Sequence, residues 1–332
     1  MSEITQKRQS KLFAASSPHI FQRQTVQNIM LDVVIALIPA AAYGVIQFGV
    51  NALLVMLASV ASAIACEALT QWIVKKPITI YDCSAIVSGM LIGMGCPPDV
   101  PVWVPVLGSA FAMIVVKQMF GGLASNFVNA ALTGRAFMVI CWPDLMTKWT
   151  FTEVVSSATS TTQATPLEAL HYGEPPTYGQ LFFGDIAGTI GEVCKVALLV
   201  GGLYLLLRKV IRLHGPVSYI GTVFLLTFAF GGENGLFSGD GLYAILAGGV
   251  IMAGLFMVTD YSTAPITGAG QIIFGIGAGL ITFLIRQYGS YPEGVTYALL
   301  LMNILTPLID RITRPKLYGE AKKHGKNAKA SN

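Results

Sequence analysis

The sequence has very few charged residues. Of its 332 residues only 11% are Asp, Glu, Lys or Arg, whereas 54% are hydrophobic. An ordinary globular domain contains roughly 25% charged residues. This shortage of charge excludes a typical soluble enzyme and predicts an integral membrane protein.

The sequence also lacks the motifs of common soluble-enzyme chemistry. It has no Walker loop, no HExxH pair and no credible Ser/His/Asp arrangement, and its four histidines are dispersed, so we expect neither catalytic residues of its own nor a metal site. Cysteine pairs at CxxC spacing are missing as well. The five cysteines are expected to be buried thiols in or beside apolar runs: Cys66, Cys83, Cys96, Cys141 and Cys194.

Strong net charge and a removable leader are missing too. The formal net charge is only +4 and the basic residues are scattered, so no nucleic-acid partner is expected. Residues 1–24 are polar and contain no apolar core before a small-residue cleavage site. We therefore expect the first apolar run to direct insertion into the lipid bilayer.

Apolar runs separated by short polar breaks fill most of the chain. A helix needs about 20 apolar residues to cross the hydrocarbon layer, and no alternating strand pattern suggests a barrel. The fold class predicted is an all-α polytopic membrane protein with about ten transmembrane helices. The expected spans are residues 30–48, 50–74, 83–95, 102–120, 124–142, 186–207, 217–231, 242–258, 267–285 and 295–309.

Basic residues flank alternate ends of these spans and predict their orientation. Lys75 and Lys76, the group at 208–212 and the group at 311–316 would face the cytoplasm, which places both termini there. Arg286 is the one basic residue on the opposite side. The expected organisation is a cytoplasmic segment 1–29, a membrane repeat 30–142, an extracytoplasmic loop 143–184, a second membrane repeat 185–311 and a basic cytoplasmic tail 312–332.

The two membrane segments resemble each other weakly but in order. The small-residue run at 88–93 has a counterpart at 248–254, and residues 120–132 have one at 288–299. With five spans in each, the second copy would be inverted relative to the first, as in many transporters. The third run of each half is short or interrupted by Gly or Pro, which predicts broken helices there.

Several charged residues fall inside or at the ends of the spans. Such residues are costly in hydrocarbon and are therefore functional candidates. We expect Asp32, Lys117 and Asp260 to lie at helix ends at headgroup level, and Glu67 is a further candidate. Arg135 and Glu192 are stronger candidates. The guanidinium of Arg135 can hold a phosphate or a carboxylate, and Glu192 can bind a cation or hydrogen-bond a ring.

Six ordered motifs, together with the polar run at 161–167, give the chain a family resemblance. The motifs are Ser-Pro-His at 17–19, the run at 29–40, Lys-Gln-Met-Phe-Gly-Gly-Leu at 117–123 leading into 129–137, Ala-Thr-Pro-Leu at 164–167, Gly-Thr-Ile-Gly-Glu at 188–192, and 256–260 followed by 262–267. On these residues the chain resembles the RnfD/NqrB family, the large membrane subunits of the Rnf and sodium-pumping NADH:quinone oxidoreductase complexes.

The resemblance implies a covalent flavin. In the family, FMN is joined through its phosphate to the last threonine of a Ser/Thr-Gly-Ala-Thr sequence by a separate flavin transferase. Carried over, that residue is Thr165, with Gln163 standing where the family usually has glycine. Thr159, which follows Ser157 and Ala158, is the alternative acceptor. Pro166 and Leu167 after Thr165 favour Thr165.

The resemblance also implies the chain's role and partners. It would be the flavin-carrying membrane subunit of an Rnf complex in a bacterial or archaeal cytoplasmic membrane. The complex relays electrons between ferredoxin and NAD and exports sodium or protons, and its other subunits carry flavins and iron–sulfur clusters. The family also allows a second, non-covalent riboflavin. Arg135 and Asn129 are the hypothesised flavin-phosphate or packing residues, and Glu192 is a further cofactor-binding candidate.

Two other readings stay open on the sequence alone. The predicted inverted repeat and broken helices would serve a stand-alone transporter or channel for a small solute equally well. A purely structural subunit would need no cofactor. The threonine motif distinguishes them, because only a flavoprotein needs it.

Overall fold

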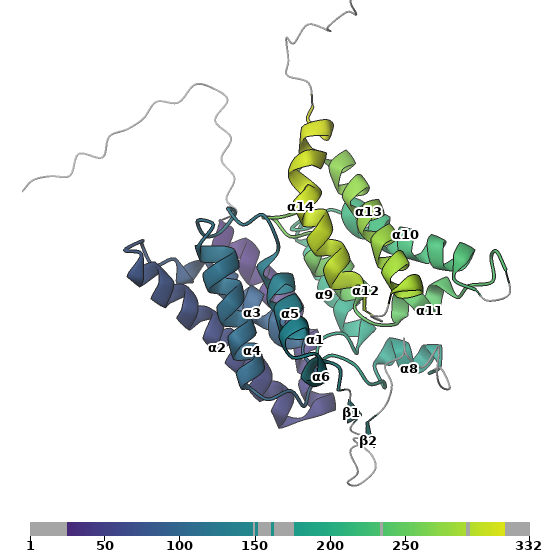
Figure 1. The fold of residues 1–332 in the computed structure, drawn as a ribbon, viewed down its shortest axis with the longest axis horizontal. Helices are drawn as coiled ribbons and strands as arrows, with labels where there is room; N and C mark the ends of the chain where they lie inside the picture. The colour runs from purple at the N-terminus through teal and green to yellow at the C-terminus, as the bar shows by residue number, and fades with distance from the viewer. Residues whose placement is uncertain are drawn as a thin grey trace, which may run out of the picture.

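The computed structural model describes residues 25–148, 150–151, 161–162, 176–232, 235–289 and 293–315. Thr165 and Thr159, the two predicted flavin acceptors, lie outside these residues, so the predicted attachment is not tested by the fold. Within the described residues the protein is almost entirely helical (Figure 1). The prediction of a mainly helical fold is therefore confirmed for the described residues.

The first half contains two long helices and three shorter ones. Helix α1 (Val26–Phe48) begins where the Thr25 side chain accepts a hydrogen bond from the Asn28 amide. Gly49, with a φ of 78°, turns the chain directly into α2 (Val50–Ile73). A 3₁₀ turn, η1 (Ile80–Asp82), precedes α3 (Ser84–Met94). Then α4 (Trp103–Phe111) continues as a π-helix, η2 (Ala112–Gln118), and α5 (Ala130–Cys141) completes the half.

The interval between the halves contains short elements. Helix α6 (Pro143–Met146) follows α5. Strands β1 (Thr150–Phe151) and β2 (Thr161–Thr162) pair antiparallel, with Thr150 opposite Thr162. Helix α8 (Tyr178–Phe183) then leads back toward the helical body. This pair of two-residue strands is a small exception to the all-helical prediction.

The second half repeats the mixture of long and broken helices. It consists of α9 (Lys195–Leu207), α10 (His214–Phe230), α11 (Gly241–Leu246), α12 (Val250–Met252) continuing as the π-helix η3 (Ala253–Met257), α13 (Gly268–Tyr288) and α14 (Val295–Thr313). Gly248 separates α11 from α12 and has a φ of 65°, a conformation that favours glycine. The predicted interruption of this run is therefore confirmed.

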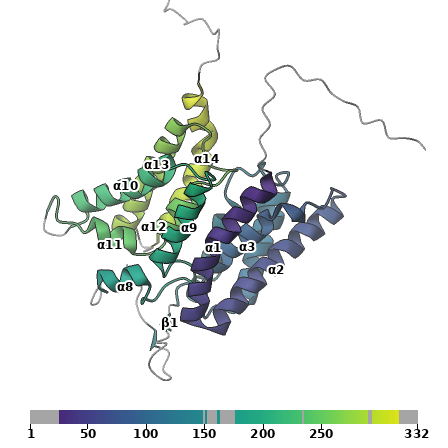
Figure 2. The same cartoon turned by 180° about the vertical axis from the view of Figure 1, so that it is seen from behind.

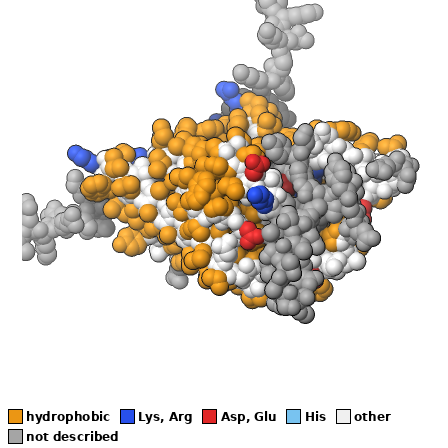
Figure 3. All heavy atoms as spheres, turned by 60° about the horizontal axis from the view of Figure 1, so that its bottom comes forward, with side chains coloured by type: hydrophobic (Ala, Val, Ile, Leu, Met, Phe, Trp, Pro, Cys, Tyr) orange, Lys and Arg blue, Asp and Glu red, His pale blue; other side chains and the backbone are white. Residues whose placement is uncertain are grey.

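Four described helices, α1, α2, α13 and α14, are long and apolar enough to cross a membrane. The other apolar helices are shorter, at 10–17 residues. Large hydrophobic side chains remain exposed on the outer faces, for example Ile46, Leu57 and Ile304. Figure 3 shows hydrophobic side chains spread over much of one face with few charges between them. These features are those of a multi-pass membrane protein.

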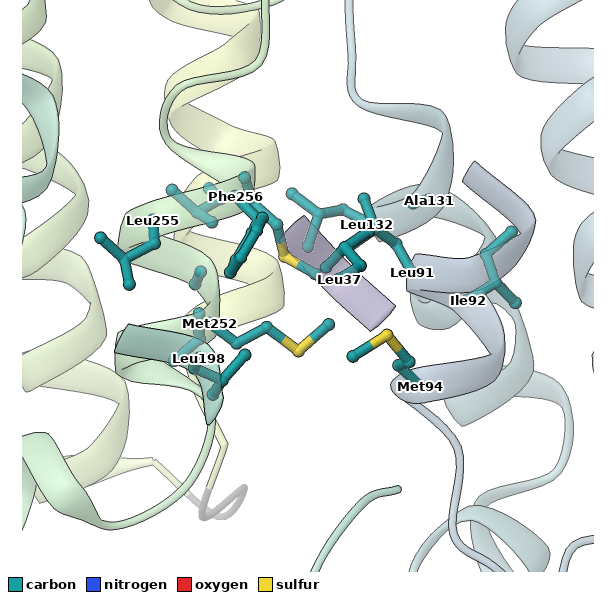
Figure 4. Packing of buried hydrophobic residues seen from close by; sticks show 14 of the residues in the cluster. Leu37, Leu91, Ile92, Met94, Ala131, Leu132, Leu198, Met252, Leu255 and Phe256 are labelled. Atoms are coloured by element: carbon teal, nitrogen blue, oxygen red, sulfur yellow. The ribbon is translucent and has the colours of Figure 1, made fainter. Parts of the chain in front are cut away.

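The two halves pack against each other through two pairs of helices. Helix α1 contacts α9 and helix α5 contacts α14, while α2 and α10 each pack against the neighbouring helices of their own half. Figure 4 shows Leu37, Leu91 and Met94 of the first half facing Leu198, Met252 and Phe256 of the second. All of these side chains are buried. One hydrophobic core therefore joins both halves.

The ends of the helical body lie on one side. Figures 1 and 2 show the start of α1 and the end of α14 at the same edge of the molecule, with the β1–β2 pair at the opposite edge.

The predicted span at 186–207 is wrong in its first part. Helix α9 begins only at Lys195, and residues 184–194 are non-helical although mostly buried. Similarly, the predicted span at 124–142 becomes helical only at Ala130. Apolar composition marks these segments as buried but does not distinguish helix from an irregular segment whose backbone groups find partners elsewhere in the fold.

Candidate functional site

The irregular segment before α9 pairs with the broken end of α3. The last carbonyls of a helix have no partner within the helix. The Gly191 amide donates to the Met94 carbonyl at 2.8 Å, and the Ile190 amide donates to the Cys96 carbonyl at 3.1 Å. Two freed backbone acceptors are thereby satisfied inside the protein, as a membrane interior requires. This pairing fixes the position of Glu192, which follows immediately.

Arg135 on α5 binds two carboxylates from the second half. Its Nη1 donates to Glu192 Oε1 at 2.9 Å, and its Nη2 donates to Glu293 Oε2. The side chains of Arg135 and Glu192 are only 8% and 5% exposed, and that of Glu293 is 22% exposed. A guanidinium suits this task because its fork of donors is planar and permanently charged.

Two more cations satisfy backbone carbonyls around the break between α11 and α12. Lys195 Nζ donates to the Gly248 carbonyl at 3.0 Å and also to the Glu192 carbonyl. Arg286 on α13 donates from Nη1 to the Ala244 carbonyl at 2.7 Å and from Nη2 to the Ala247 carbonyl at 3.3 Å. In many transporters, carbonyls at such breaks coordinate a bound cation. Here side-chain cations of the protein occupy that role.

We call Arg135, Glu192, Lys195, Arg286 and Glu293 the central charge cluster. Its members interact electrostatically with one another. Three are basic and two acidic, so the formal charge of the cluster is 3 − 2 = +1. Buried charges in a membrane domain are expensive unless they are paired and hydrogen-bonded. This combination of charges at broken helices is the strongest candidate functional feature of the described residues.

A second buried ion pair, between Lys117 and Glu67, lies within the first half. Lys117, on the π-helix η2, is 2.7 Å from Glu67 Oε1 and also donates to Ser84 Oγ at 2.6 Å. Gln118 Nε2 donates to the same Glu67 oxygen at 2.9 Å. Lys117 is the next-to-last residue of η2 and is only 3% exposed, so it lies at a helix end, as predicted, but is buried within the protein. The π-helix turns its side chain inward to the buried carboxylate of Glu67.

Asn129 lies apart from the central charge cluster. Its Oδ1 accepts the amides of Ala131 and Leu132 and so caps α5. Its Nδ2 donates to Asp260 Oδ2 at 3.1 Å, across the two halves. Asp260 also accepts hydrogen bonds from Ser262 and Thr263. The hydrogen bond between Asn129 and Asp260 therefore joins the segment after η3 to the start of α5.

Asp32, on α1, has two partners at the end of α9. It accepts hydrogen bonds from Tyr204 at 2.9 Å and from Arg208. The side chain of Arg208 is 55% exposed and that of Asp32 only 10%. Asp32 lies in the second turn of α1 and is buried, with an exposed cation as its partner, and its predicted position at headgroup level stays a prediction.

Two adjoining cavities open beside Asp260. The inner cavity has a volume of ≈ 70 Å³, and its lining includes Lys117, Ser84 and Asn129. The outer cleft has a volume of ≈ 420 Å³, and its lining includes Lys209, Arg212 and Gln271. Val210, Ile211, Thr259, Asp260 and Tyr261 line both. The inner cavity has room for roughly two water molecules, whereas the outer cleft is in the size range of small-molecule sites.

The structure joins two of the predicted site residues and extends the site beyond them. Arg135 and Glu192 form an ion pair, whereas Asn129 belongs to a different contact. The sequence reasoning missed Glu293 and Lys195 as cluster members. In the sequence, Lys195 is recognisable as a lone lysine in an apolar run, and Arg286 as the one basic residue on the unexpected side of the membrane. No group of three or more metal-ligating side chains occurs among the residues that the structure describes.

The fold and the cluster define a polytopic helical membrane protein with broken helices and buried ion pairs between its halves. The chain belongs to the NQR2, RnfD, RnfE family, whose profile matches residues 13–319. It is 43% identical over 316 residues to a subunit of the proton-translocating ferredoxin:NAD(+) oxidoreductase complex of Clostridium ljungdahlii, covering 92% of this chain and 95% of that protein.

Two further relatives agree with this family. A subunit of the Na(+)-translocating ferredoxin:NAD(+) oxidoreductase complex of Acetobacterium woodii is 42% identical over 313 residues, covering 94% of this chain and 96% of that protein. A subunit of the ion-translocating oxidoreductase complex of Stutzerimonas stutzeri is 35% identical over 329 residues, covering 90% of this chain and 93% of that protein. The predicted family resemblance is confirmed.

Proposed function

We propose that this chain is the flavin-carrying membrane subunit of an ion-translocating ferredoxin:NAD oxidoreductase, assembled with the other subunits of that complex. The observation that carries the proposal is its similarity, over nearly its whole length, to one subunit from each of two such complexes. One of those relatives is named for protons and the other for sodium, and we propose export of one of these two ions.

The covalent cofactor of this proposal is FMN on Thr165, attached by a flavin transferase. When bound, FMN supplies electron transfer, and the chain holds and positions it. Support comes from the Ala164-Thr165-Pro166-Leu167 motif and from the nearby β1–β2 pair, which ends three residues before Thr165 at Thr162. Thr159 remains the alternative acceptor.

The predicted flavin contacts of Arg135, Asn129 and Glu192 stay a prediction. Both terminal nitrogens of Arg135 already donate to carboxylates, so a phosphate would have to displace Glu192 or Glu293. Asn129 is likewise engaged, with Asp260. We therefore base the proposed flavin site on the threonine and not on these three residues.

The outer cleft beside Asp260 supports a second, non-covalent riboflavin. Its ≈ 420 Å³ volume suits a ring system, and Tyr261 contributes an aromatic side chain to its lining. Gln271 also lines it, and Gln271 Oε1 is buried with no hydrogen-bond partner among the described residues. Such an oxygen can accept a hydrogen bond from a ring N–H. Denaturing the purified wild-type complex should release a non-covalent flavin. This flavin should be missing when the complex contains the Gln271→Leu variant.

The orientation proposed has both termini in the cytoplasm. Basic residues lie in the last turn of α14 or follow the ends of α2, α9 and α14, at the edge of the molecule where α1 begins: Lys75, Lys76, Lys209, Arg212, Arg311 and Arg314. Positive charge concentrates on the cytoplasmic side of membrane proteins. The β1–β2 pair would then lie on the extracytoplasmic side.

The architecture proposed is a pair of inverted five-helix repeats. In this scheme α1 corresponds to α9, α2 to α10, α3 to the broken helix α11–α12, α4 to α13 and α5 to α14. The contacts of α1 with α9 and of α5 with α14 support it, because equivalent elements meet at a pseudo-twofold axis. So does the third helix of each half, because α3 has only 11 residues and its counterpart is interrupted between α11 and α12.

In-gel flavin fluorescence tests the proposal against a stand-alone transporter or a cofactor-free scaffold. A covalent flavin survives denaturation, so the wild-type chain made together with the transferase should fluoresce under ultraviolet light. Thr159→Ala should fluoresce equally, whereas Thr165→Ala should be dark at equal protein amount. A dark wild-type band would overturn the flavin function, and a fluorescent Thr165→Ala band would move the attachment to another residue.

A further inference from the structure

The central charge cluster contains one more positive than negative charge, and only one of its cations can readily lose a proton. Arg135 and Arg286 remain protonated in proteins. Lys195 is the first residue of α9 and is 0% exposed. Its position at the helix N-terminus also places a positive charge at the positive end of the helix dipole. Removal of one proton from Lys195 makes the cluster formally neutral.

The Lys195 side chain joins two irregular segments of the second half. Its ammonium donates to the Glu192 carbonyl before α9 and to the Gly248 carbonyl at the break between α11 and α12. Glu192 also carries the carboxylate that binds Arg135 of the first half. The protonated lysine therefore connects the start of α9, the broken helix and, through Glu192, the helix α5.

The groups around Lys195 are few and identifiable. Glu192 precedes it on the irregular segment, Cys194 is its neighbour in the chain, Glu293 precedes α14, and Arg286 extends from α13. Glu293 has the most exposed carboxylate of the cluster, at 22%.

We propose that Lys195 is a proton-binding site that controls how tightly the broken helix α11–α12 is held against α9. In the protonated state, charge-assisted hydrogen bonds join Nζ to the two carbonyls. In the other state one N–H bond breaks, its proton passes to water outside the cluster, and the neutral amine makes roughly half as strong a bond to each carbonyl. No electron and no co-reactant takes part.

The proposal concerns the membrane core and does not depend on flavin attachment. Hydrogen exchange followed by mass spectrometry on the purified complex tests it, in peptides covering residues 186–195 and 244–252. After correction for the chemical exchange rate, the wild type should exchange at least about fivefold faster at about pH 9 than at about pH 6, the factor expected for a weakened hydrogen bond of about 1 kcal/mol.

Variants that fix each state complete the test. Lys195→Arg keeps a permanent charge and should exchange slowly at both pH values. Lys195→Met has no donor and should exchange rapidly at both, and Lys76→Met, which changes an exposed lysine that lines neither cavity, should behave as the wild type. A flat wild-type profile would overturn the proposal, and so would a Lys195→Arg profile that rises as steeply as the wild type. Both comparisons stand even if Lys195→Met does not assemble. In-gel flavin fluorescence of the same samples tests the proposed flavin function separately.

Discussion

Gly249 lies directly against the carboxylate of Glu192. A Cβ atom at Gly249 would be 2.5 Å from Glu192 Oε1 and 3.3 Å from Oε2. Only a residue without a side chain therefore lets the start of α12 approach the cluster this closely. The contact joins the broken helix of the second half to the ion pair between Glu192 and Arg135.

Gly249→Ala should disturb the cluster without adding or removing a charge. The added methyl group must displace Glu192 or the α11–α12 break, and we expect a loss of about 1–3 kcal/mol of stability, as for other overpacked sites. Thermal unfolding of the purified chain in detergent measures it. Gly221→Ala is the matched control, because nothing lies within 4 Å of a Cβ at Gly221. Equal melting temperatures for the two variants would contradict the close contact.

Arg135→Met should be among the most destabilising single changes. It removes the shared partner of Glu192 and Glu293, and breaking a buried ion pair costs about 3–5 kcal/mol. The same substitution at Arg208, whose side chain is 55% exposed in its pair with Asp32, should cost far less, because water screens an exposed ion pair. Chemical or thermal unfolding compares the two.

The charge origin of the Arg135 effect can be separated from lost packing. In the triple variant Arg135→Met, Glu192→Gln and Glu293→Gln, no uncompensated carboxylate remains at this site, so much of the lost stability should return. If the triple variant is less stable than Arg135→Met alone, unpaired carboxylates are not the cause of the loss.

The contact between α8 and α11 should titrate with pH. Tyr178 donates a hydrogen bond to Asp240, and this bond raises the pKa of the Tyr178 phenol above its usual value. A raised pKa means that the contact stabilises the fold below the ordinary tyrosine pKa of about 10 and that this contribution disappears as pH rises through the raised value.

Absorbance titration of the phenolate measures this shift. In Asp240→Asn the asparagine can still cap α11, but the negative charge beside the phenol is gone. The difference titration between the two proteins should show tyrosine ionisation shifted to lower pH in the variant. Superimposable curves would show that Asp240 does not control Tyr178.

The sequence predicted the class of fold well because hydropathy alone reports burial in a membrane. It placed the break near Gly248 because glycine clusters there interrupt an apolar run. It failed at residues 184–194, where an apolar segment is buried without being helical. The partners of its backbone, Met94 and Cys96, are about 90 residues away in the sequence, and no local pattern reveals such a pairing.

The candidate site was predicted only in part for a similar reason. Arg135 and Glu192 were found because each is a charge in an apolar run, and charges there need a partner. Their pairing with each other and with Glu293 depends on tertiary structure. The inward position of Lys117 depends on the π-helix η2, whose wider turn has no clear sequence signature. The flavin attachment, in contrast, rests on the family motif, since both candidate threonines lie outside the described residues.

Mass spectrometry of the peptide 152–168 tests most directly whether FMN is attached to Thr165. The protein would be purified from cells that also make the transferase, digested, and its peptides fragmented. The expected peptide is heavier by one FMN joined with loss of water, and its fragment ions place the added mass on Thr165. An unmodified peptide from the fully assembled complex would contradict the account.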